Sequence, residues 1–303
     1  MKKLISLVLV FIFMVSLCSC GETATAMYIN GTDIDAEVYG YYLSVVTNSP
    51  EYNETEDKDK AVSSLCAGYV AAKEMIKNYN IKLSAKDKVN VSSDIKVQWQ
   101  LYSSFYKKYG VSKQTLCRML EHEKLIDSLV ISLYGEGGER AVKNNDVLSF
   151  FKQHYAIIKL ITTDFRPGME DSEIKTITDK YTAMRNLIKG GGDFASAAQQ
   201  YPELVKYEDV EHIISSFDTS YPSGMLTKVL QMKNGDTQVL RYSNGIYLVQ
   251  KKEATSYYNV YKDDCIIKMK KADILKEIEE AAKNYTWNYN RNIISKIESK
   301  AGL

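Results

Sequence analysis

The sequence has few histidines, few prolines and almost no excess of either charge. Its three histidines are His122, His154 and His212, which leaves Ser–His–Asp or Cys–His catalysis with little support. Four prolines form no proline-rich linker, and the length suggests two domains. The 39 basic and 38 acidic residues nearly balance, so nothing in the charge favours nucleic acid as a partner.

Long apolar runs are absent after residue 17. Before it, a positive head of Lys2 and Lys3 precedes an apolar run, residues 4–17, that is too short to span a bilayer comfortably. Together with the small residues that follow, this pattern is typical of an export signal. An ordinary cleaved signal and an uncleaved anchor are the alternatives that remain open.

The sequence Leu17-Cys18-Ser19-Cys20-Gly21 resembles the lipobox of bacterial lipoproteins. The resemblance implies that residues 1–20 are a lipoprotein signal peptide and that the thiol of Cys20 carries lipid. Two or three acyl chains make a stable anchor where one would be marginal. We therefore expect an exported protein, lipid-anchored to the extracytoplasmic face of a bacterial membrane.

Paired cysteines are also lacking. Beyond the signal, Cys66, Cys117 and Cys265 lie far apart, and no Cys-x-x-Cys motif occurs. Three cysteines cannot form a complete disulfide framework. Since Cys66 and Cys117 lie in helical apolar patterns, we interpret them as buried thiols.

Most of the first half of the chain has helical periodicity. Residues 27–31 read as a brief strand and an Asn-Gly turn, with Asp33 or Asp35 as the cap of the first helix. The first helix is predicted at residues 33–46, and further helices at 60–79, 84–109, 112–134 and 145–151. His122, between two glutamates, is expected on a helix surface.

The pattern changes at residue 155. The β-branched run 155–163 predicts a buried strand, and the segments 239–242 and 246–250 flank a hairpin turn at 243–245. Helices are expected at 170–189, 194–201 and 226–232, and helical periodicity returns from 257 to the end. The fold class is therefore α+β, with helices on both sides of a compact module built from a small antiparallel sheet and helices.

Several motifs carry a wider resemblance. MYINGTDIDAEVYGYYL, YGVSKQTLCRML and NNDVLSFFKQHY resemble the SurA/PrsA-type chaperone domain. KLITTD, IKGGGDFASAAQQYPE and LQMKNGDTQVLRYSNGIYLVQKKE resemble a parvulin-type peptidyl-prolyl isomerase module. The resemblance implies an N-terminal helical chaperone domain at 21–154, a parvulin-like domain at 155–254, and C-terminal helices at 255–303 that pack on the N-terminal domain.

The parvulin polar cluster, two histidines and a Cys or Asp, is not matched. Its three places fall on Lys159, near Leu204 and on Tyr247. The family's apolar, proline-binding cup is better preserved. The places implied for a peptide-binding groove are Lys159, Leu204, Phe217, Tyr221, Met225 and Tyr247, and we assign no catalytic residue.

Three functions follow from the resemblance. The first is a chaperone or foldase that binds unfolded or nascent exported polypeptides and has a degenerate parvulin site. Its N-terminal lipid would attach it to the membrane. The second is an active peptidyl-prolyl isomerase with a rewired site. The third is a structural or interaction lipoprotein with one dedicated partner. Whether the protein is an enzyme stays open at this point.

We expect no cofactor and no metal. The acidic stretch with one histidine, at 208–212, is interpreted as a solvated loop, because clustered carboxylates with a single imidazole are more often solvated than metal-bound.

Overall fold

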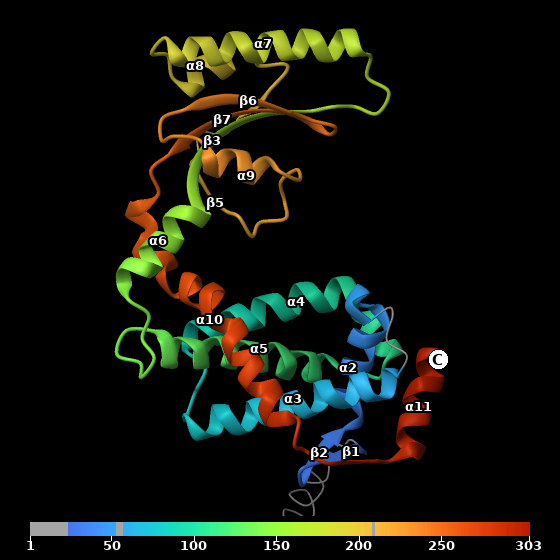
Figure 1. The fold of residues 1–303 in the computed structure, drawn as a ribbon. Coiled ribbons are helices and arrows are strands. Elements are labelled where there is room, and N and C mark those ends of the chain that lie inside the picture. The colour runs from blue at the N-terminus through green and yellow to red at the C-terminus, as the bar shows by residue number, and fades with distance from the viewer. Residues whose placement is uncertain (1–23, 53–56, 208–209) are drawn as a thin grey trace, which may run out of the picture. The chain divides into compact units, whose positions relative to one another are not determined.

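The computed structural model describes residues 24–52, 57–207 and 210–303 (Figure 1). The chain divides into two compact units: unit 1 is Met1–Tyr134 with Met269–Leu303, and unit 2 is Gly135–Lys268. That residues 155–254 fold independently of the flanking helices stays a prediction. None of the helices in the described part of the chain combines the length and the apolar character needed to cross a bilayer. Cys20 lies outside the described residues.

Unit 1 consists mainly of helices. They are α2 (Ala36–Asn48), α3 (Lys58–Asn78), α4 (Ala85–Lys108), α5 (Lys113–Tyr134) and α11 (Arg291–Ala301), with a short 3₁₀ turn, η1 (Pro50–Tyr52). α10 (Tyr258–Ala282) begins in unit 2 and ends in unit 1. Local chemistry sets the helix ends. Ser84 and Asp87 form a reciprocal capping box at the start of α4, and Gly110, with a φ of 76°, follows its end.

Unit 1 also contains an antiparallel sheet with the strand order β2-β1-β8. Its strands are β1 (Thr25–Ile29), β2 (Thr32–Asp35) and β8 (Trp287–Tyr289). Asn30 and Gly31 form the predicted turn between the first two strands, with φ angles of 48° and 79°. The prediction of uninterrupted helical periodicity after residue 257 is wrong at β8, which separates α10 from α11.

The α2 helix packs closely against the turn that follows α4. A Cβ atom built on Gly40 would lie 2.1 Å from the backbone oxygen of Tyr109. The Tyr109 hydroxyl in turn accepts hydrogen bonds from Thr47 and Asn48 at the end of α2, at 3.0 and 2.8 Å. The absence of a side chain at Gly40 is therefore what allows the two backbones to approach.

Unit 2 is built around an antiparallel sheet with the order β4-β3-β7-β6, and β5 also pairs with β3. The strands are β3 (Tyr155–Asp164), β4 (Lys206–Tyr207), β5 (His212–Ser215), β6 (Thr237–Tyr242) and β7 (Gly245–Lys252). The helices are α6 (Asn144–His154), α7 (Asp171–Lys189), α8 (Phe194–Gln199) and α9 (Met225–Gln231), followed by the 3₁₀ turn η2 (Thr255–Tyr257). The expected hairpin joins β6 and β7, with Tyr242 opposite Gly245.

Helices cover both faces of this sheet: α7 and α8 lie on one side and α9 on the other (Figure 1). Strand alternation divides the apolar side chains accordingly. Ile161, Ile246 and Leu248 pack with α7 and α8, whereas Ile158 and Val249 pack with α9. Unit 2 therefore has two small cores, one on each side of a single layer of strands.

Candidate functional site

The sheet of unit 2 separates the positions implied for the parvulin polar cluster. Along β3, Ile158 and Leu160 belong to the core under α9, and Ile161 belongs to the core under α7 and α8. Alternation therefore places Lys159 on the α7 and α8 side. Tyr247, in contrast, packs in the core under α9. Lys159 and Tyr247 thus lie on opposite faces of the sheet.

Leu204 lies on the same face as Lys159. Its side chain packs against the core under α7 and α8, and its backbone oxygen accepts a 2.6 Å hydrogen bond from the Thr163 hydroxyl. That hydroxyl also hydrogen-bonds the buried Tyr181 hydroxyl at 2.8 Å. The surroundings of Leu204 are therefore those of a packed interior.

The Tyr247 hydroxyl is on the other side, near the hairpin. It accepts a 3.2 Å hydrogen bond from the Asn244 amide, and burial raises the pKa of Tyr247. The neighbouring Tyr242 ring lies edge-on to it at 6.0 Å. The hydroxyl group of Tyr242 is buried without a hydrogen-bond partner among the described residues.

The structure brings together only part of the implied apolar cup. Met225 is completely buried in the core under α9, where Tyr221 and Tyr247 also pack. Because Met225 is an interior residue, a charged substitution there would unfold unit 2 rather than report on binding. Met225 and Tyr247 are interior residues of this core, whereas the partly buried Tyr221 also lines a cavity.

Lys251 fixes α9 to the sheet in a way that the sequence did not reveal. Its buried ammonium group donates hydrogen bonds of 2.6 and 2.9 Å to the backbone oxygens of Leu230 and Met232 at the C-terminal end of α9. Burial lowers the pKa of Lys251. A cation at a helix C-terminus is favourable, and here it positions the helix that covers this core.

Phe217 belongs to a separate, exposed aromatic cluster. Its ring stacks with His154 at 5.2 Å and lies 6.1 Å from Phe150, while the Lys268 ammonium lies 5.1 Å from the Phe217 centroid. The His154 ring is also tied to the Ser216 hydroxyl at 2.8 Å. Phe150 and His154, four residues apart on α6, are neighbours on one helix face, a spacing that could have indicated this cluster from the sequence.

A shallow cavity of about 460 Å³ adjoins this loop, lined within residues 216–227. Tyr221, Pro222 and Leu226 contribute apolar surface to it, and Ser216 and Thr227 contribute hydroxyl groups. Asp218 also lines the cavity, so apolar, hydroxyl and carboxylate groups all contribute to its surface.

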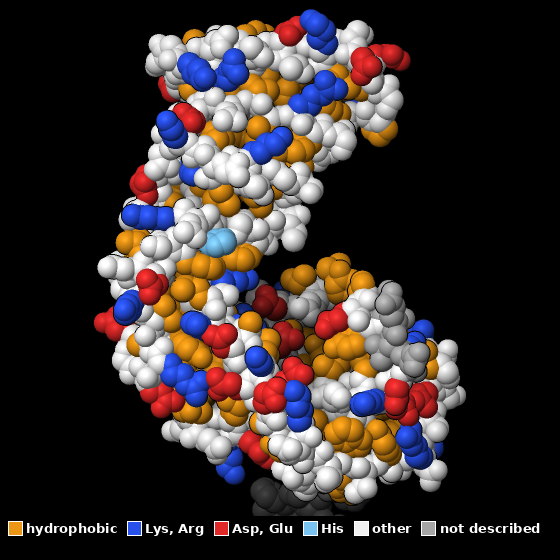
Figure 2. Space-filling view, viewed as in Figure 1, with side chains coloured by type: hydrophobic (Ala, Val, Ile, Leu, Met, Phe, Trp, Pro, Cys, Tyr) orange, Lys and Arg blue, Asp and Glu red, His pale blue; other side chains and the backbone are white. Residues whose placement is uncertain are grey.

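An exposed apolar surface lies on α4 in unit 1. Val97, Leu101 and Tyr102 are 53%, 64% and 54% exposed, and we call these three residues the α4 stripe. Only Val91 and Ile95 of this helix are fully buried. Figure 2 shows hydrophobic side chains gathered at the edge of unit 1 where α4 runs. Val97 and Leu101, four residues apart, are neighbours on the helix surface, and grouped exposed apolar side chains are a feature of interaction sites.

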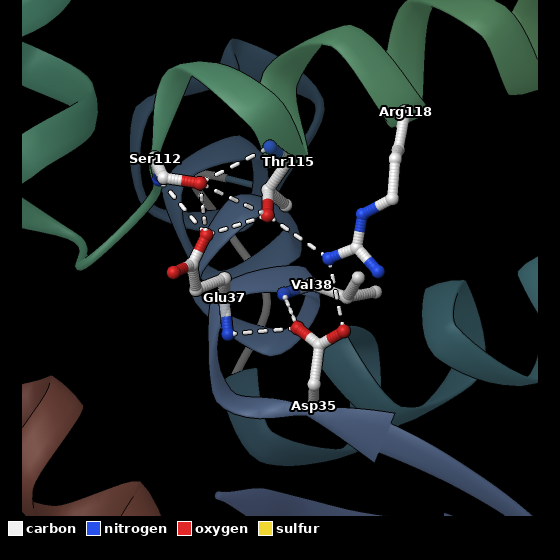
Figure 3. A network of polar contacts seen from close by, with 6 residues as sticks. All are labelled: Asp35, Glu37, Val38, Ser112, Thr115 and Arg118. Carbon is white, nitrogen blue, oxygen red and sulfur yellow. Dashed lines mark hydrogen bonds and ion pairs between the residues drawn. The ribbon is translucent and has the colours of Figure 1, made fainter. Parts of the chain in front are cut away.

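A polar network joins the starts of α2 and α5 (Figure 3). The Glu37 carboxylate accepts hydrogen bonds from the Ser112 backbone at 3.1 Å, from the Ser112 hydroxyl, and from the Thr115 hydroxyl at 2.5 Å. Arg118 bridges Thr115 and Asp35, each at 2.9 Å. Asp35 also caps α2 by accepting from the backbone of Glu37 and Val38.

This network is structural. Burial alone would raise the pKa of Glu37, but the hydrogen bonds from Ser112 and Thr115 and the charge of Arg118 together lower it below its ordinary value. Each carboxylate here already accepts several donors. We therefore interpret the network as the joint that holds α2 and α5 in register.

The expectation for His122 is wrong. The side chain is buried against Tyr69, with ring centroids 4.5 Å apart, and burial together with the charge of Lys73 lowers its pKa to about 4. In the 208–212 segment, residues 208 and 209 lie outside the described residues, and Glu211 pairs with Lys252 at 2.5 Å. No group of potential metal ligands is found among the residues that the structure describes. Cys66 and Cys265 are buried free thiols, and Cys117 is half-buried.

No protein-family model matches the chain, and no curated protein is significantly similar to it in sequence. Solved structures do match it. A foldase protein PrsA from Streptococcus pneumoniae is 15% identical, with a TM-score of 0.45, covering 92% of this chain and 99% of that one. PrsA from Lactococcus lactis is 13% identical, with a TM-score of 0.42 and the same coverage.

A Campylobacter jejuni structure, described as a SurA-like chaperone, is 12% identical over 88% of this chain and 99% of that one, with a TM-score of 0.31. At identities this low, the likeness concerns the fold and not the activity.

Proposed function

We propose that this protein is a lipid-anchored extracytoplasmic chaperone that binds unfolded exported polypeptides. The observation that carries the proposal is the α4 stripe, where Val97, Leu101 and Tyr102 are each more than half exposed. Exposing apolar area to water costs roughly 25 cal/mol per Å², and exposed apolar side chains grouped on one surface are a feature of interaction sites. A chain that has not yet buried its own apolar residues is a natural ligand for it.

The chemistry of the stripe suits a ligand without a fixed sequence. Val97 and Leu101 are four residues apart and therefore neighbours on the helix surface, and they offer shape without hydrogen-bonding demands. Tyr102 adds an amphipathic ring that contacts apolar groups while its hydroxyl stays hydrated. Contacts of this kind discriminate little between client sequences.

Unit 2 is proposed to contribute binding surface rather than catalysis. Lys159 and Tyr247, which stand at two of the family's polar places, lie on opposite faces of the sheet, and Leu204 offers no polar side chain. The aromatic cluster at Phe217 and the neighbouring cavity remain available for an extended segment.

Aggregation suppression by the soluble body, residues 24–303, tests the role of the stripe. We expect Leu101→Lys to weaken suppression of a denatured client several-fold. Gln100→Lys is the matched control, because it adds the same charge at an exposed position on the same helix without removing apolar surface. Circular dichroism confirms that both variants fold. Equal suppression by the two variants would refute the role of α4, and a wild-type body that suppresses nothing would favour a dedicated partner.

Lipid anchoring is tested separately with Cys20→Ala. The motive is the Leu-x-Ser-Cys-Gly sequence after the apolar run. We expect the variant to lose incorporation of a fatty-acid analogue and to leave the membrane fraction. Label retained on the variant would contradict acylation at this thiol.

A further inference from the structure

The sheet of unit 1 has one face in the core and one face in solvent. Met27 and Ile29 of β1 are buried, whereas Tyr28 between them is 50% exposed. Tyr28 lies directly opposite Asp33 on β2 and Asn288 on β8, and both of these are exposed as well. These three side chains form a row across the sheet, which we call the outer row.

The chain joins this sheet very soon after the proposed anchor. The backbone oxygen of Ala24 already accepts a 2.8 Å hydrogen bond from Ala36, so the fold holds the chain from that residue onward. Four residue steps separate Ala24 from Cys20, and a fully extended chain covers at most about 14 Å in that interval. A bilayer of about 40–45 Å with a core of about 30 Å leaves headgroup layers of roughly 5–8 Å on each side. Crossing the headgroup layer therefore takes up much of the maximum length of the tether.

We propose that the outer row of the β2-β1-β8 sheet rests against the lipid headgroups of the membrane that holds the anchor. This inference relies on the lipid anchoring of the proposed function. Tyrosine at the centre of the row suits this position, because its amphipathic ring is favoured at the boundary between lipid and water. Asp33 is the only charged member of the row, so the contact results from the short tether and not from attraction to anionic lipid.

The proposed contact also orients the binding surface. Within unit 1, α4 and the sheet lie on opposite sides, with α3 and α5 between them (Figure 1). Placing the sheet against lipid directs the α4 stripe away from the bilayer. The surface proposed to bind clients then stays free of competition from lipid, which would otherwise cover exposed apolar side chains.

Footprinting of two native tyrosines tests the contact. Tyr28 and Tyr102 are 50% and 54% exposed in the same unit, so their intrinsic reactivity toward hydroxyl radicals is closely matched. The acylated full-length protein in phosphatidylcholine vesicles is compared with the soluble body, residues 24–303. We expect oxidation of Tyr28 to fall several-fold on vesicles, while oxidation of Tyr102 stays unchanged.

A variant with a longer tether tests whether the short tether causes the protection of Tyr28. A flexible glycine–serine spacer of about 20 residues after Gly21 has a typical end-to-end distance of roughly 25 Å, and it should restore the reactivity of Tyr28. Protection that persists with the spacer would overturn the tether argument. Flotation with vesicles is measured first: a protein that does not float overturns both proposals, whereas a floating protein with fully reactive Tyr28 overturns this one alone.

Discussion

Replacing Gly40 by alanine should destabilise unit 1 even though alanine is the better helix former. The substitution in α2 gains roughly 0.5–1 kcal/mol of helix propensity. However, the new Cβ atom would lie 2.1 Å from the Tyr109 backbone oxygen and 3.7 Å from Ile297. A carbonyl held in a turn cannot rotate away as the end of a flexible side chain can. Overpacking of this kind typically costs about 1–3 kcal/mol or more, so the clash outweighs the propensity.

Gly68 in α3 provides a matched control. It too lies inside a helix, but its added Cβ atom meets only Ile278 at 3.9 Å, which is ordinary van der Waals contact. Gly68→Ala should therefore stabilise unit 1 by up to about 1 kcal/mol. The two substitutions have the same chemistry and opposite expected signs.

Urea denaturation followed by tryptophan fluorescence measures both effects. The two tryptophans, Trp99 and Trp287, both lie in unit 1, so their emission follows the unfolding of this unit. We expect the free energy of unfolding to fall for Gly40→Ala and to rise for Gly68→Ala, with an unchanged dependence on urea concentration. If Gly40→Ala is as stable as Gly68→Ala, then the close packing of α2 on the α4–α5 turn is incorrect.

Four further predictions follow from single features. Burial lowers the pKa of His122 from 6.5 in the unfolded chain to about 4, so unit 1 should lose up to about 3 kcal/mol of unfolding free energy as the pH falls from 6.5 to 4. His122→Gln should flatten this part of the stability profile measured with urea. An unchanged slope would contradict the burial of His122. Tyr39→Phe should leave stability within about 0.5 kcal/mol of wild type, because the buried hydroxyl has no partner among the described residues; a loss above about 2 kcal/mol would show that it has one. Excision of residues 155–253 with a short linker should leave cooperative tryptophan-monitored unfolding, and its loss would count against an inserted module. The body should speed cis/trans exchange of an X-Pro peptide, which takes on the order of 10–100 s uncatalysed, only weakly; strong acceleration that Tyr247→Phe abolishes would show a rewired active site.

The helices were predictable because their signals are local. α4 follows a Ser84 cap and ends before Gly110, and the β6–β7 hairpin has its turn at Ser243-Asn244. These features depend on residues within a few positions of one another, so they can be recognised from the sequence alone. The α+β class follows from the order in which such segments occur.

The sidedness of the site could not be predicted in this way. Whether Lys159 and Tyr247 meet depends on the register between β3 and β7, where Tyr247 lies opposite Thr162 and Lys159 lies opposite Gln250. A shift of one residue would move a side chain to the other face, and nothing near either residue in the sequence fixes that register. The sequence therefore implied which residues could form the site but not how they lie relative to one another.

The burial of His122 is a different case, because the signal was present. Met119, His122, Ile126 and Leu129 follow one another at intervals of three and four residues, which places them on one face of α5. The flanking Glu121 and Glu123 suggested solvent, but helix neighbours in sequence point in different directions. Here periodicity was the better guide than local composition.

The pairing of β1 with β8 has a consequence for how the protein is made. Met27 and Tyr289 are partners in one sheet although they come from nearly opposite ends of the chain, while every strand of unit 2 lies in one continuous segment. During vectorial synthesis, unit 1 cannot complete its sheet until its last residues have emerged, whereas unit 2 has all its strands earlier. Premature release or truncation near the C-terminus would therefore leave β1, which follows the proposed anchor within a few residues, with an open edge.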